Sequence, residues 1–391
     1  MTNTVPLTLA VHDYDHVRDL CSGAVGVEGV TLRCLHFPVE EIFFRFTRFR
    51  EWDVSELSLA KYASLRAAGD DSLVAIPVFT SRAFRHSAIF VRPDGPVDDP
   101  AALAGARIGV PEWTQTATVY ARGVLAHEFG VALSDVSWVQ AGTNEPGRSE
   151  GVAFAVPAGV SLTPMPEQTL NGLLLAGEID ALIAAHPPTE FKRGSGRIVR
   201  LFSDYRAVEE RSYRETGVFP IMHVVTLRAE LHARHPWIAM NLLSAFEAAK
   251  QRSLARALDA NAPRFPVPWG PANAQRAQEL IGEDFWPYGL EPNRSTLETF
   301  LQLAFEQGVC ARRLTAQELF VPEVRQAYTV GCDRLAGVAP AASRIACSSG
   351  SSAARRLFAR NGLLIAAATI SSASCALSSP GANDARNAIA A

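Results

Sequence analysis

The sequence lacks the short patterns by which nucleotide-binding and zinc-binding proteins are usually recognised. It contains no Gly-x-Gly-x-x-Gly segment and no P-loop, so a nicotinamide or nucleotide cofactor has no sequence support. Its six cysteines include no Cys-x-x-Cys pair and no histidine at zinc-finger spacing, which argues against a structural zinc site. Six scattered cysteines in 391 residues also give no sign of a disulfide scaffold, and we expect a reducing compartment.

Long basic runs and long apolar runs are missing as well. No basic stretch is long enough to follow a nucleic acid backbone, and the formal net charge is -3. No apolar stretch reaches the ~20 residues that a membrane-spanning helix needs. The first ten residues have neither the basic start nor the apolar core of an export signal. We therefore expect no nucleic acid partner, no membrane span and a cytoplasmic location.

What the sequence does contain is an alternation of strand-length and helix-length segments. Apolar runs at 5–11, 32–37, 52–58 and 73–79 predict strands, and helices are expected at 17–22, 38–49 and up to residue 68. A second series has a strand ending at 111, a helix over 114–129 and further strands at 136–140 and 179–183. The pattern predicts an α/β fold with two doubly wound lobes and a cleft between them.

The lobe boundaries are predicted from composition. Arg92-Pro-Asp-Gly-Pro96 has linker chemistry, and the apolar stretch 217–227 would return the chain to the first lobe. We therefore predict lobe one from residues 1–92 plus 218–328 and lobe two from residues 93–217. Residues 329–391 turn abruptly to Ala, Ser and Gly, so we expect a disordered low-complexity tail. Within this tail, residues 355–375 resemble a displaced lipoprotein signal.

Several segments carry a resemblance to one family. They are Ala10-Val-His-Asp-Tyr-Asp15, Asp53-Val-Ser-Glu-Leu-Ser58, Ser81-Arg-Ala-Phe-Arg-His-Ser87, Phe219-Pro-Ile-Met-His-Val-Val225 and Gly282-Glu-Asp-Phe-Trp-Pro-Tyr-Gly-Leu-Glu-Pro-Asn293. Together they resemble the 4,5-dihydroxyphthalate decarboxylase family over residues 7–326. The resemblance implies the fold of type 2 periplasmic binding proteins and the non-oxidative conversion of 4,5-dihydroxyphthalate to protocatechuate and carbon dioxide in phthalate breakdown. It departs at His186, where the family pattern suggests an arginine.

One loop after a predicted apolar strand holds the first candidate residues for a dicarboxylate substrate. Arg82 and Arg85 offer cationic forks for the carboxylates, and Ser81 lies beside them. His86 is the first candidate for proton transfer, because imidazole titrates near neutral pH. The alternatives are that the arginines are surface charges and that His86 is a structural histidine.

Further candidates follow other strands of the two lobes. Asp13 and Tyr14 come after the first strand, and Glu56 and Ser58 lie at the end of the third, so all could reach the catechol hydroxyls. Asp13 and Glu56 are the remaining catalytic candidates, although Asp13 could instead cap a helix. The substrate-binding candidates of the second lobe and of its return segment are Glu112, Thr114, Thr116, Arg148 and His223, with Thr114 also a candidate N-cap.

Two functions stay open on the sequence. The first is the decarboxylase, acting on a small aromatic dicarboxylate, and the second is a solute-binding protein that holds an aromatic carboxylate without catalysis. The missing export signal favours the enzyme. No cofactor is predicted, although Glu56, His86 and His223 could gather around a divalent metal. Whether the chain forms a homo-oligomer is also left open by the sequence.

Overall fold

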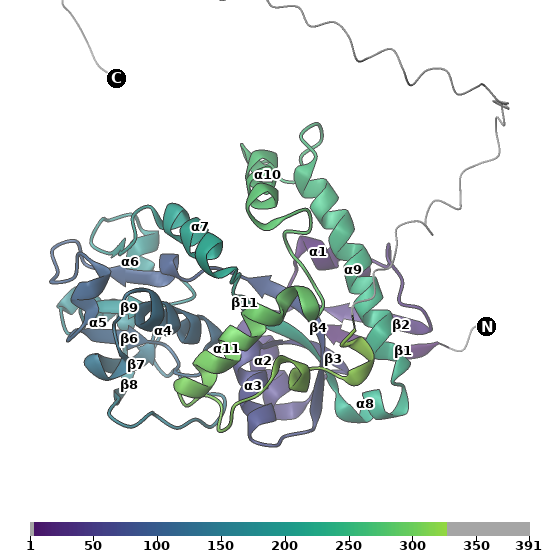
Figure 1. Cartoon of the computed structure of the whole chain (residues 1–391), viewed down its shortest axis with the longest axis horizontal. Coiled ribbons are helices and arrows are strands. Elements are labelled where there is room, and N and C mark those ends of the chain that lie inside the picture. The colour runs from purple at the N-terminus through teal and green to yellow at the C-terminus, as the bar shows by residue number, and fades with distance from the viewer. Residues whose placement is uncertain (1–3, 327–391) are drawn as a thin grey trace, which may run out of the picture. The chain divides into compact units, whose positions relative to one another are not determined.

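The computed structural model describes residues 4–326 (Figure 1). These residues form two β-sheets, each with helices packed on it. The predicted tail at 329–391 and its lipoprotein-like segment lie outside the described residues.

The first sheet has the strand order β2-β1-β3-β11-β4. Its strands are β1 (Val5–Ala10), β2 (Val30–Leu35), β3 (Val54–Ser58), β4 (Leu73–Arg82) and β11 (Ile221–Arg228). The connecting helices are α1 (Asp15–Cys21), α2 (Val39–Phe49) and α3 (Leu59–Ala67). β1 is parallel to β2 and to β3, whereas β11 returns from the second sheet and runs antiparallel to both β3 and β4. The ends of β3 and β4 therefore meet the start of β11 at one edge of the sheet.

The second sheet has the strand order β10-β5-β9-β6-β7-β8. Its strands are β5 (Ile89–Val91), β6 (Arg107–Val110), β7 (Ser137–Gly142), β8 (Ser161–Thr169), β9 (Ala181–Ile183) and β10 (Val199–Arg200). Its helices are α4 (Thr116–Glu128), α5 (Leu170–Ala176), α6 (Thr189–Lys192) and α7 (Tyr205–Thr216). Gly177 ends α5 at φ 75°, the left-handed conformation that glycine adopts without a steric cost. Strands β9, β6, β7 and β8 are parallel neighbours, as a doubly wound lobe requires.

The chain crosses between the sheets earlier than the sequence predicted. β5 already pairs with β9 of the second sheet, so the crossing lies between Arg82 and Ile89 and includes the short 3-10 turn η1 (His86–Ala88). The segment Arg92-Pro-Asp-Gly-Pro96 is instead a turn within the second lobe, closed by the Gly95 N–H on the carbonyl of Arg92. Its Pro and Gly residues signal a turn, while the true crossing contains neither residue and gives no compositional sign.

Four helices follow β11. They are α8 (Ala229–Arg234), α9 (Trp237–Leu258), α10 (Gly270–Ile281) and α11 (Arg294–Glu306), with the 3-10 turn η4 (Glu291–Asn293) before the last. Helix α9 packs on α1 and β4, whereas α11 packs on α4 of the second lobe. Figure 1 shows α10 and the end of α9 extending away from the first sheet. The helical periodicity of the sequence predicts helices over 235–258 and 297–307, close to α9 and α11, although α10 was not anticipated.

Buried polar groups help to join α11 to the second lobe. Gln307 directly follows α11. The indole Nε1 of Trp113 donates to its backbone carbonyl at 2.8 Å, and the Nε of Arg122 donates to the side-chain Oε1 of Gln307 at 2.7 Å. The Arg122 guanidinium also stacks on the Trp113 ring, with 3.8 Å between Cζ and the ring centroid. These hydrogen bonds give buried polar atoms partners inside the protein, without which they would destabilise the fold.

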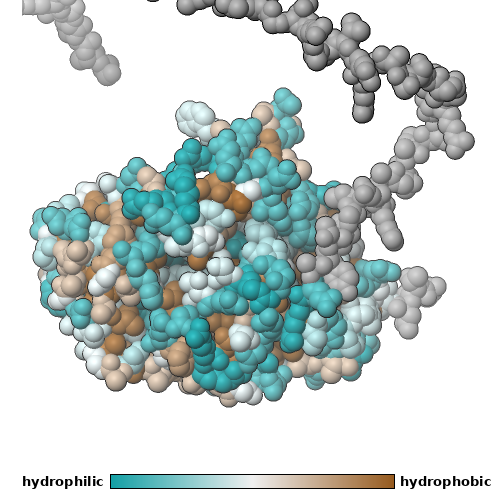
Figure 2. All heavy atoms as spheres, viewed as in Figure 1, coloured by the Kyte–Doolittle hydropathy of each residue, from teal (hydrophilic) through white to brown (hydrophobic). Residues whose placement is uncertain are grey.

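The surface and the cysteines complete this description. On the face shown in Figure 2, hydrophobic residues occur as scattered patches among hydrophilic ones. No helix among residues 4–326 is long and apolar enough to cross a bilayer. Cys21 on α1 and Cys34 on β2 are paired as a disulfide, with their Cα atoms 5.4 Å apart. This single pair forms because the fold brings α1 against β2, and the cysteine spacing gave no sign of it.

Candidate functional site

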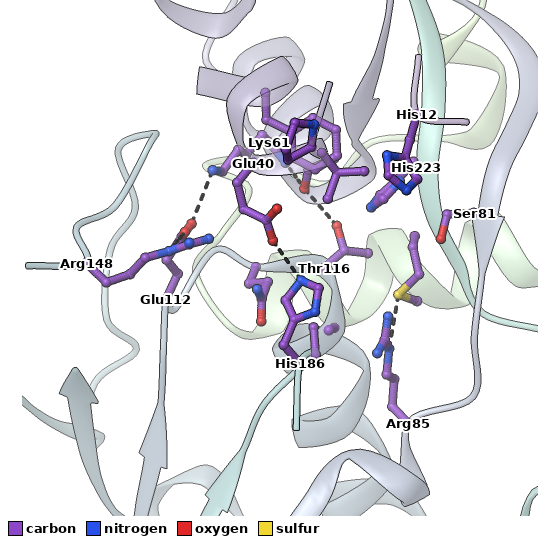
Figure 3. Close-up of a pocket in the computed structure, with 18 of the residues that line it drawn as sticks. His12, Glu40, Lys61, Ser81, Arg85, Glu112, Thr116, Arg148, His186 and His223 are labelled. Atoms are coloured by element: carbon purple, nitrogen blue, oxygen red, sulfur yellow. Dashed lines mark hydrogen bonds and ion pairs between the residues drawn. The ribbon is translucent and has the colours of Figure 1, made fainter. Parts of the chain in front are cut away.

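A cleft of about 380 Å³ lies where the two lobes face each other (Figure 3). Its walls are built from residues that follow the ends of strands in both sheets, which is where ligands bind in open α/β folds. The lining residues are His12, Tyr14, Pro38, Val39, Glu40, Phe43, Ser58, Lys61, Ser81, Arg85, Glu112, Gln115, Thr116, Ala117, Arg148, Ala185, His186, Met222 and His223.

The hydroxyl groups of Ser58 and Thr116 join the two lobes at the base of the cleft. Ser58 ends β3 and caps α3, and Thr116 begins α4, so each hydroxyl stands at the first turn of a helix. Their oxygens are 2.9 Å apart. The Thr116 hydroxyl also accepts the backbone N–H of Ala60 at 3.0 Å. These contacts cross from one lobe to the other, so the described structure is a closed arrangement at this point.

A buried carboxylate forms the second contact between the lobes. Glu112 follows β6 and is 2% exposed. Its oxygens contact the Nζ of Lys61 from the first lobe at 3.2 Å and the Nε of Arg148 at 2.5 Å. Figure 3 shows the three side chains converging at one end of the cleft. Because Lys61 and Arg148 share one carboxylate, their charges are partly neutralised before any substrate binds.

Glu40 and His186 form a third contact across the cleft. The His186 Nε2 lies 2.8 Å from Oε1 of Glu40, which is in the first turn of α2. This neighbour holds the pKa of the Glu40 carboxyl down, to about 2. The departure from the family pattern at His186 therefore still leaves a group at that position that can pair with Glu40.

Arg85 is a cation on the cleft wall without a carboxylate partner in the described part of the chain. Its Nε donates to the Sδ of Met222 at 3.1 Å, and Figure 3 shows the guanidinium extending toward that sulfur. Burial lowers the pKa of Arg85 to about 10, partly opposed by the charge of Glu209. The group stays protonated at neutral pH, so it is available to an anion in the cleft.

Tyr14, His223 and Glu56 form a polar chain that leads from the cleft into the first sheet. The Tyr14 hydroxyl lies 3.4 Å from Nδ1 of His223, and the same nitrogen lies 3.9 Å from Oε1 of Glu56. His223 pairs in register with both Ser58 and Ser81, which places it where β3, β4 and β11 meet. Burial lowers the pKa of His223 to about 3, so the imidazole is neutral at neutral pH.

Comparison with known proteins finds relatives of this chain. No family model matches the chain. It is 40% identical over 325 residues to a protein of Comamonas testosteroni named 4,5-dihydroxyphthalate decarboxylase, covering 83% of this chain and 98% of that protein. A protein of Pseudomonas putida with the same name is 40% identical over 213 residues, covering 54% of this chain and 83% of the relative. This chain belongs to the 4,5-dihydroxyphthalate decarboxylase family.

Solved structures place this family member on the predicted fold. A putative sulfonate ABC transporter periplasmic sulfonate-binding protein from Methylobacillus flagellatus matches with a TM-score of 0.50 and 12% identity, covering 83% of this chain and 93% of that one. The periplasmic aliphatic sulphonate binding protein of Escherichia coli gives a TM-score of 0.47 and 13% identity, covering 82% of this chain and 99% of that one. The likeness to the Methylobacillus protein concerns the fold alone, which is the periplasmic-binding-protein-like architecture predicted from the sequence.

The structure gathers most of the predicted binding residues of this family member in the cleft. Those that line it are Tyr14, Ser58, Ser81, Arg85, Glu112, Thr116, Arg148 and His223. Glu56 lies one layer behind them and is fully buried. Asp13 is exposed and does not line the cleft, although both of its neighbours do.

Arg82 and Thr114 have structural partners instead. The Arg82 guanidinium donates to the backbone carbonyls of Phe219 at 2.9 Å and Pro287 at 2.8 Å, and also to the side chain of Asn293. Thr114 is fully buried, and its hydroxyl donates to Glu150. The prediction that both residues contact substrate is not supported, because each is committed to groups of the protein itself. Thr114 is not the N-cap of α4 either, since that position is Gln115.

His86 lies in a different cavity from the cleft. This second cavity, also of about 380 Å³, lies on the far side of Arg85 and is lined by the crossing segment, the return segment, α4 and α11. The Nε2 of His86 contacts Oε2 of Glu128 at 3.0 Å, and the imidazole packs on Phe129 and Phe202. The predicted proton-transfer role of His86 therefore has no support from this geometry, since its one-residue offset from Arg85 turns it away from the cleft.

The structure does not bring together the hypothesised metal ligands Glu56, His86 and His223. Residues 4–326 hold no group of three or more His, Cys, Asp or Glu side chains that could surround a metal ion.

One segment of the second lobe resembles a hydrolase motif. Gly147-Arg-Ser-Glu-Gly151 matches the pattern Gly-x-Ser-x-Gly of serine hydrolases. Residues 147–151 form an irregular loop in which Ser149 is exposed. They lack the strand-turn-helix context that the serine hydrolase pattern requires.

Sequence reasoning missed several polar residues of the cleft, among them Gln115 at the N-cap of α4. Lys61, Glu40 and His12 also line the cleft, and the first two bind partners from the other lobe. Lys61 and Glu40 lie in the first turns of α3 and α2, directly after the predicted strand ends. That position was the available signal, because first-turn residues of such helices face the same edge of the sheet as the loops.

Proposed function

We propose that this chain catalyses the non-oxidative decarboxylation of 4,5-dihydroxyphthalate to protocatechuate and carbon dioxide. Membership of the family supports the reaction. The observation that carries it is Arg85, which has no carboxylate partner within residues 4–326 and faces a cleft that Tyr14 and His223 line, with Glu56 buried behind them. An anion-binding group and a proton-transfer chain in one enclosed site are what this chemistry needs.

The substrate loses one carboxylate and gains one proton at the same ring carbon. Its two carboxylates are related by the symmetry of the molecule, as are its two hydroxyls, so the enzyme has only to hold one carboxylate while the other leaves. Each carboxylate-bearing carbon has a hydroxyl para to it, and that oxygen supplies electron density when the carbon is protonated. The bond to the carboxylate then breaks, its electron pair returns to the ring, and carbon dioxide departs.

Arg85 is the group that we assign to the retained carboxylate. Lys61 and Arg148, the other strong cations of the cleft wall, already share Glu112. Binding to Arg85 replaces only a weak N–H···S contact with Met222, whereas binding to either of the others competes with an ion pair. A carboxylate fixed at Arg85 places the ring within the cleft.

His223 is the group that we assign to the ring. Its imidazole lines the cleft and is neutral, so it can donate a proton from one nitrogen while accepting one at the other. Nδ1 faces Tyr14 and Glu56, which leaves Nε2, at the other end of the ring, for the substrate. Closure of the lobes over the ligand excludes water and strengthens each of these contacts.

The direct test is turnover of purified protein with 4,5-dihydroxyphthalate, followed as carbon dioxide release and protocatechuate formation, with and without a chelator. We expect both products in equal amounts, and loss of activity on chelation would add a divalent metal to the reaction. Tight binding of the substrate without formation of product would contradict the decarboxylase and favour a solute-binding protein. A raised KM in the Arg85→Met variant beside the wild type would link turnover to the cleft.

We also propose that the reaction takes place in the cytoplasm. In a reducing compartment the disulfide of Cys21 and Cys34 would be open as two thiols. The fold does not depend on the bond, because β2 is already held by six residue pairs with β1 and α1 by its packing on α9. Alkylation of intact cells should label both thiols; protection of both until a reductant is added would argue for an oxidising compartment.

A further inference from the structure

Glu56 is a carboxyl group in an environment that does not suit a charge. It lies on the central strand β3 and is 0% exposed, and its side-chain oxygens make no well-formed hydrogen bond within the described residues, although Thr80 and Tyr14 lie beside them. Leaving a buried polar group unpaired destabilises the fold, and burying an unpaired carboxylate would do so far more. Such a residue favours its neutral, protonated form and calls for a reason other than stability.

The contacts of Glu56 lead toward the cleft. On the neighbouring strand β11, Nδ1 of His223 lies 3.9 Å from Oε1 of Glu56. The Tyr14 hydroxyl lies 3.4 Å from that nitrogen and close enough to Glu56 for each group to perturb the pKa of the other. Both Tyr14 and His223 line the cleft, whereas Glu56 does not. The carboxyl group is therefore one residue away from the ligand.

We infer that Glu56 is a positioning residue that stores the proton delivered to the ring carbon of the substrate, passing it through Tyr14 and His223. The inference rests on the proposed decarboxylation. In the step, Nε2–H of His223 gives its proton to the ring carbon while Nδ1 takes the Tyr14 proton, and the phenol oxygen takes the proton of Glu56. The carbon–carboxylate bond breaks and its electron pair returns to the ring. Glu56 ends as a carboxylate and is reprotonated from water after the product leaves.

The charges around the chain agree with this direction of transfer. Burial raises the pKa of Glu56 to about 8, and neighbouring Thr80, the His12 backbone and Tyr14 oppose this only in part. The pKa of His223 is lowered to about 3 by burial and by Arg85. At neutral pH the carboxyl group therefore holds the proton and the imidazole is neutral. Besides its members Tyr14, His223 and Glu56, the proton-transfer chain is surrounded by four ionisable side chains, which are Tyr288, Arg85, Glu40 and His12.

The test compares the pH dependence of kcat in the wild type, Glu56→Gln and Glu56→Asp. The wild type should lose kcat as pH rises through about 8, because Glu56 then loses its proton. Glu56→Gln keeps the shape of the side chain without an acidic proton, so its kcat should fall by ~100-fold or more and the alkaline loss should vanish. Glu56→Asp should restore part of kcat and also the alkaline loss, which a merely structural role would not produce.

Glu150 provides a matched control. It is another carboxyl whose pKa burial raises, and it accepts a hydrogen bond from the Nε2 of Gln140 at 2.7 Å. It lies on the second lobe, and its hydrogen-bond partners within residues 4–326 do not include Tyr14 or His223. Glu150→Gln should leave the alkaline limb of kcat in place. Glu56→Gln with wild-type kcat and an unchanged alkaline limb would overturn the inference.

A second measurement keeps the inference separate from the proposed reaction. Difference infrared spectroscopy of the resting protein should show the carbonyl stretch of a protonated carboxyl that disappears as pH rises through about 8 and is absent in Glu56→Gln. If the wild type shows this band but releases no carbon dioxide, the proposed reaction is wrong, while Glu56 is still shown to hold a proton at neutral pH. If the band is missing at neutral pH in an active enzyme, the inference fails and the reaction stands.

Discussion

The Nε of Arg85 and the Sδ of Met222 are 3.1 Å apart, and this weak contact occupies the position where a carboxylate would be expected. Thioether sulfur is a poor acceptor, so the charge of the guanidinium is left largely uncompensated in the cleft. The arrangement keeps Arg85 extended and ready for an anion.

Replacing Arg85 by Met should weaken substrate binding. Loss of a charge-assisted hydrogen bond costs about 1.5–3 kcal/mol, so KM should rise by roughly 10- to 100-fold. Arg48 on α2 is exposed and is the control, because Arg48→Met removes the same charge away from the cleft. Steady-state kinetics on both variants checks the assignment; equal KM values in the two would remove Arg85 from the site.

Removing the charge of Glu112 should destabilise the closed form. Glu112→Gln leaves Lys61 and Arg148 facing each other without their shared anion, and breaking a buried ion pair from one side costs on the order of 3 kcal/mol. Glu41, in an exposed pair with Arg45 on α2, is the comparison, and Glu41→Gln should cost under about 1 kcal/mol. Urea denaturation curves measure the loss of stability in each of the two variants, and similar midpoints for Glu112→Gln and Glu41→Gln would contradict this account.

The Ser58–Thr116 contact predicts a separable effect on stability and on ligand binding. Thr116→Val removes the acceptor of the buried Ala60 N–H and should destabilise by about 1–3 kcal/mol while raising KM. Thr118 lies in the same helix, with its hydroxyl bonded to backbone carbonyls of its own lobe. Thr118→Val should lower stability with KM unchanged; a raised KM in that variant as well would mean that lobe contacts are not the cause.

Glu56 should also leave a signature in the pH dependence of unfolding. Its pKa is raised from 4.5 to about 8 in the folded protein, so the folded state binds the extra proton between these values. Stability therefore falls as pH rises from about 4.5 to about 8, at up to about 1.4 kcal/mol per pH unit, and stays low above that range. The free energy of unfolding of Glu56→Gln, measured from pH 5 to 9 beside the wild type, should lack this decline. Parallel curves for the two proteins would show that the carboxyl is not neutral.

Much of the fold was predictable from the sequence because its strands are short apolar runs bounded by polar loops. The strands at the start of the chain and the helices α2, α4, α9 and α11 fall close to the predicted ranges. Strand β8 was not predicted, since Ser161–Thr169 is mostly exposed and has no apolar run. The crossing was misplaced because Pro and Gly mark a turn wherever it occurs, while a lobe boundary is defined by which strands pair.

The candidate site was predictable in location but not in the roles of its neighbouring residues. Ser81, Arg82, Arg85 and His86 belong to one short segment, yet only Ser81 and Arg85 line the cleft. The end of β4 and the turn that follows decide which side each side chain faces, and the sequence alone does not reveal that twist. Contacts between lobes, such as Glu40 with His186, join residues 146 positions apart and leave no local pattern.

Arg82 has a mechanical consequence for the whole molecule. Its guanidinium ties the start of the outgoing connection to the Phe219 carbonyl of the returning one, and to Pro287 and Asn293 of the C-terminal segment. The Ala83 N–H also donates to the carbonyl of Pro220, so the two connections are bonded to each other where they leave the first sheet. The passage of the chain between the lobes is therefore one pair of joined segments rather than two independent linkers.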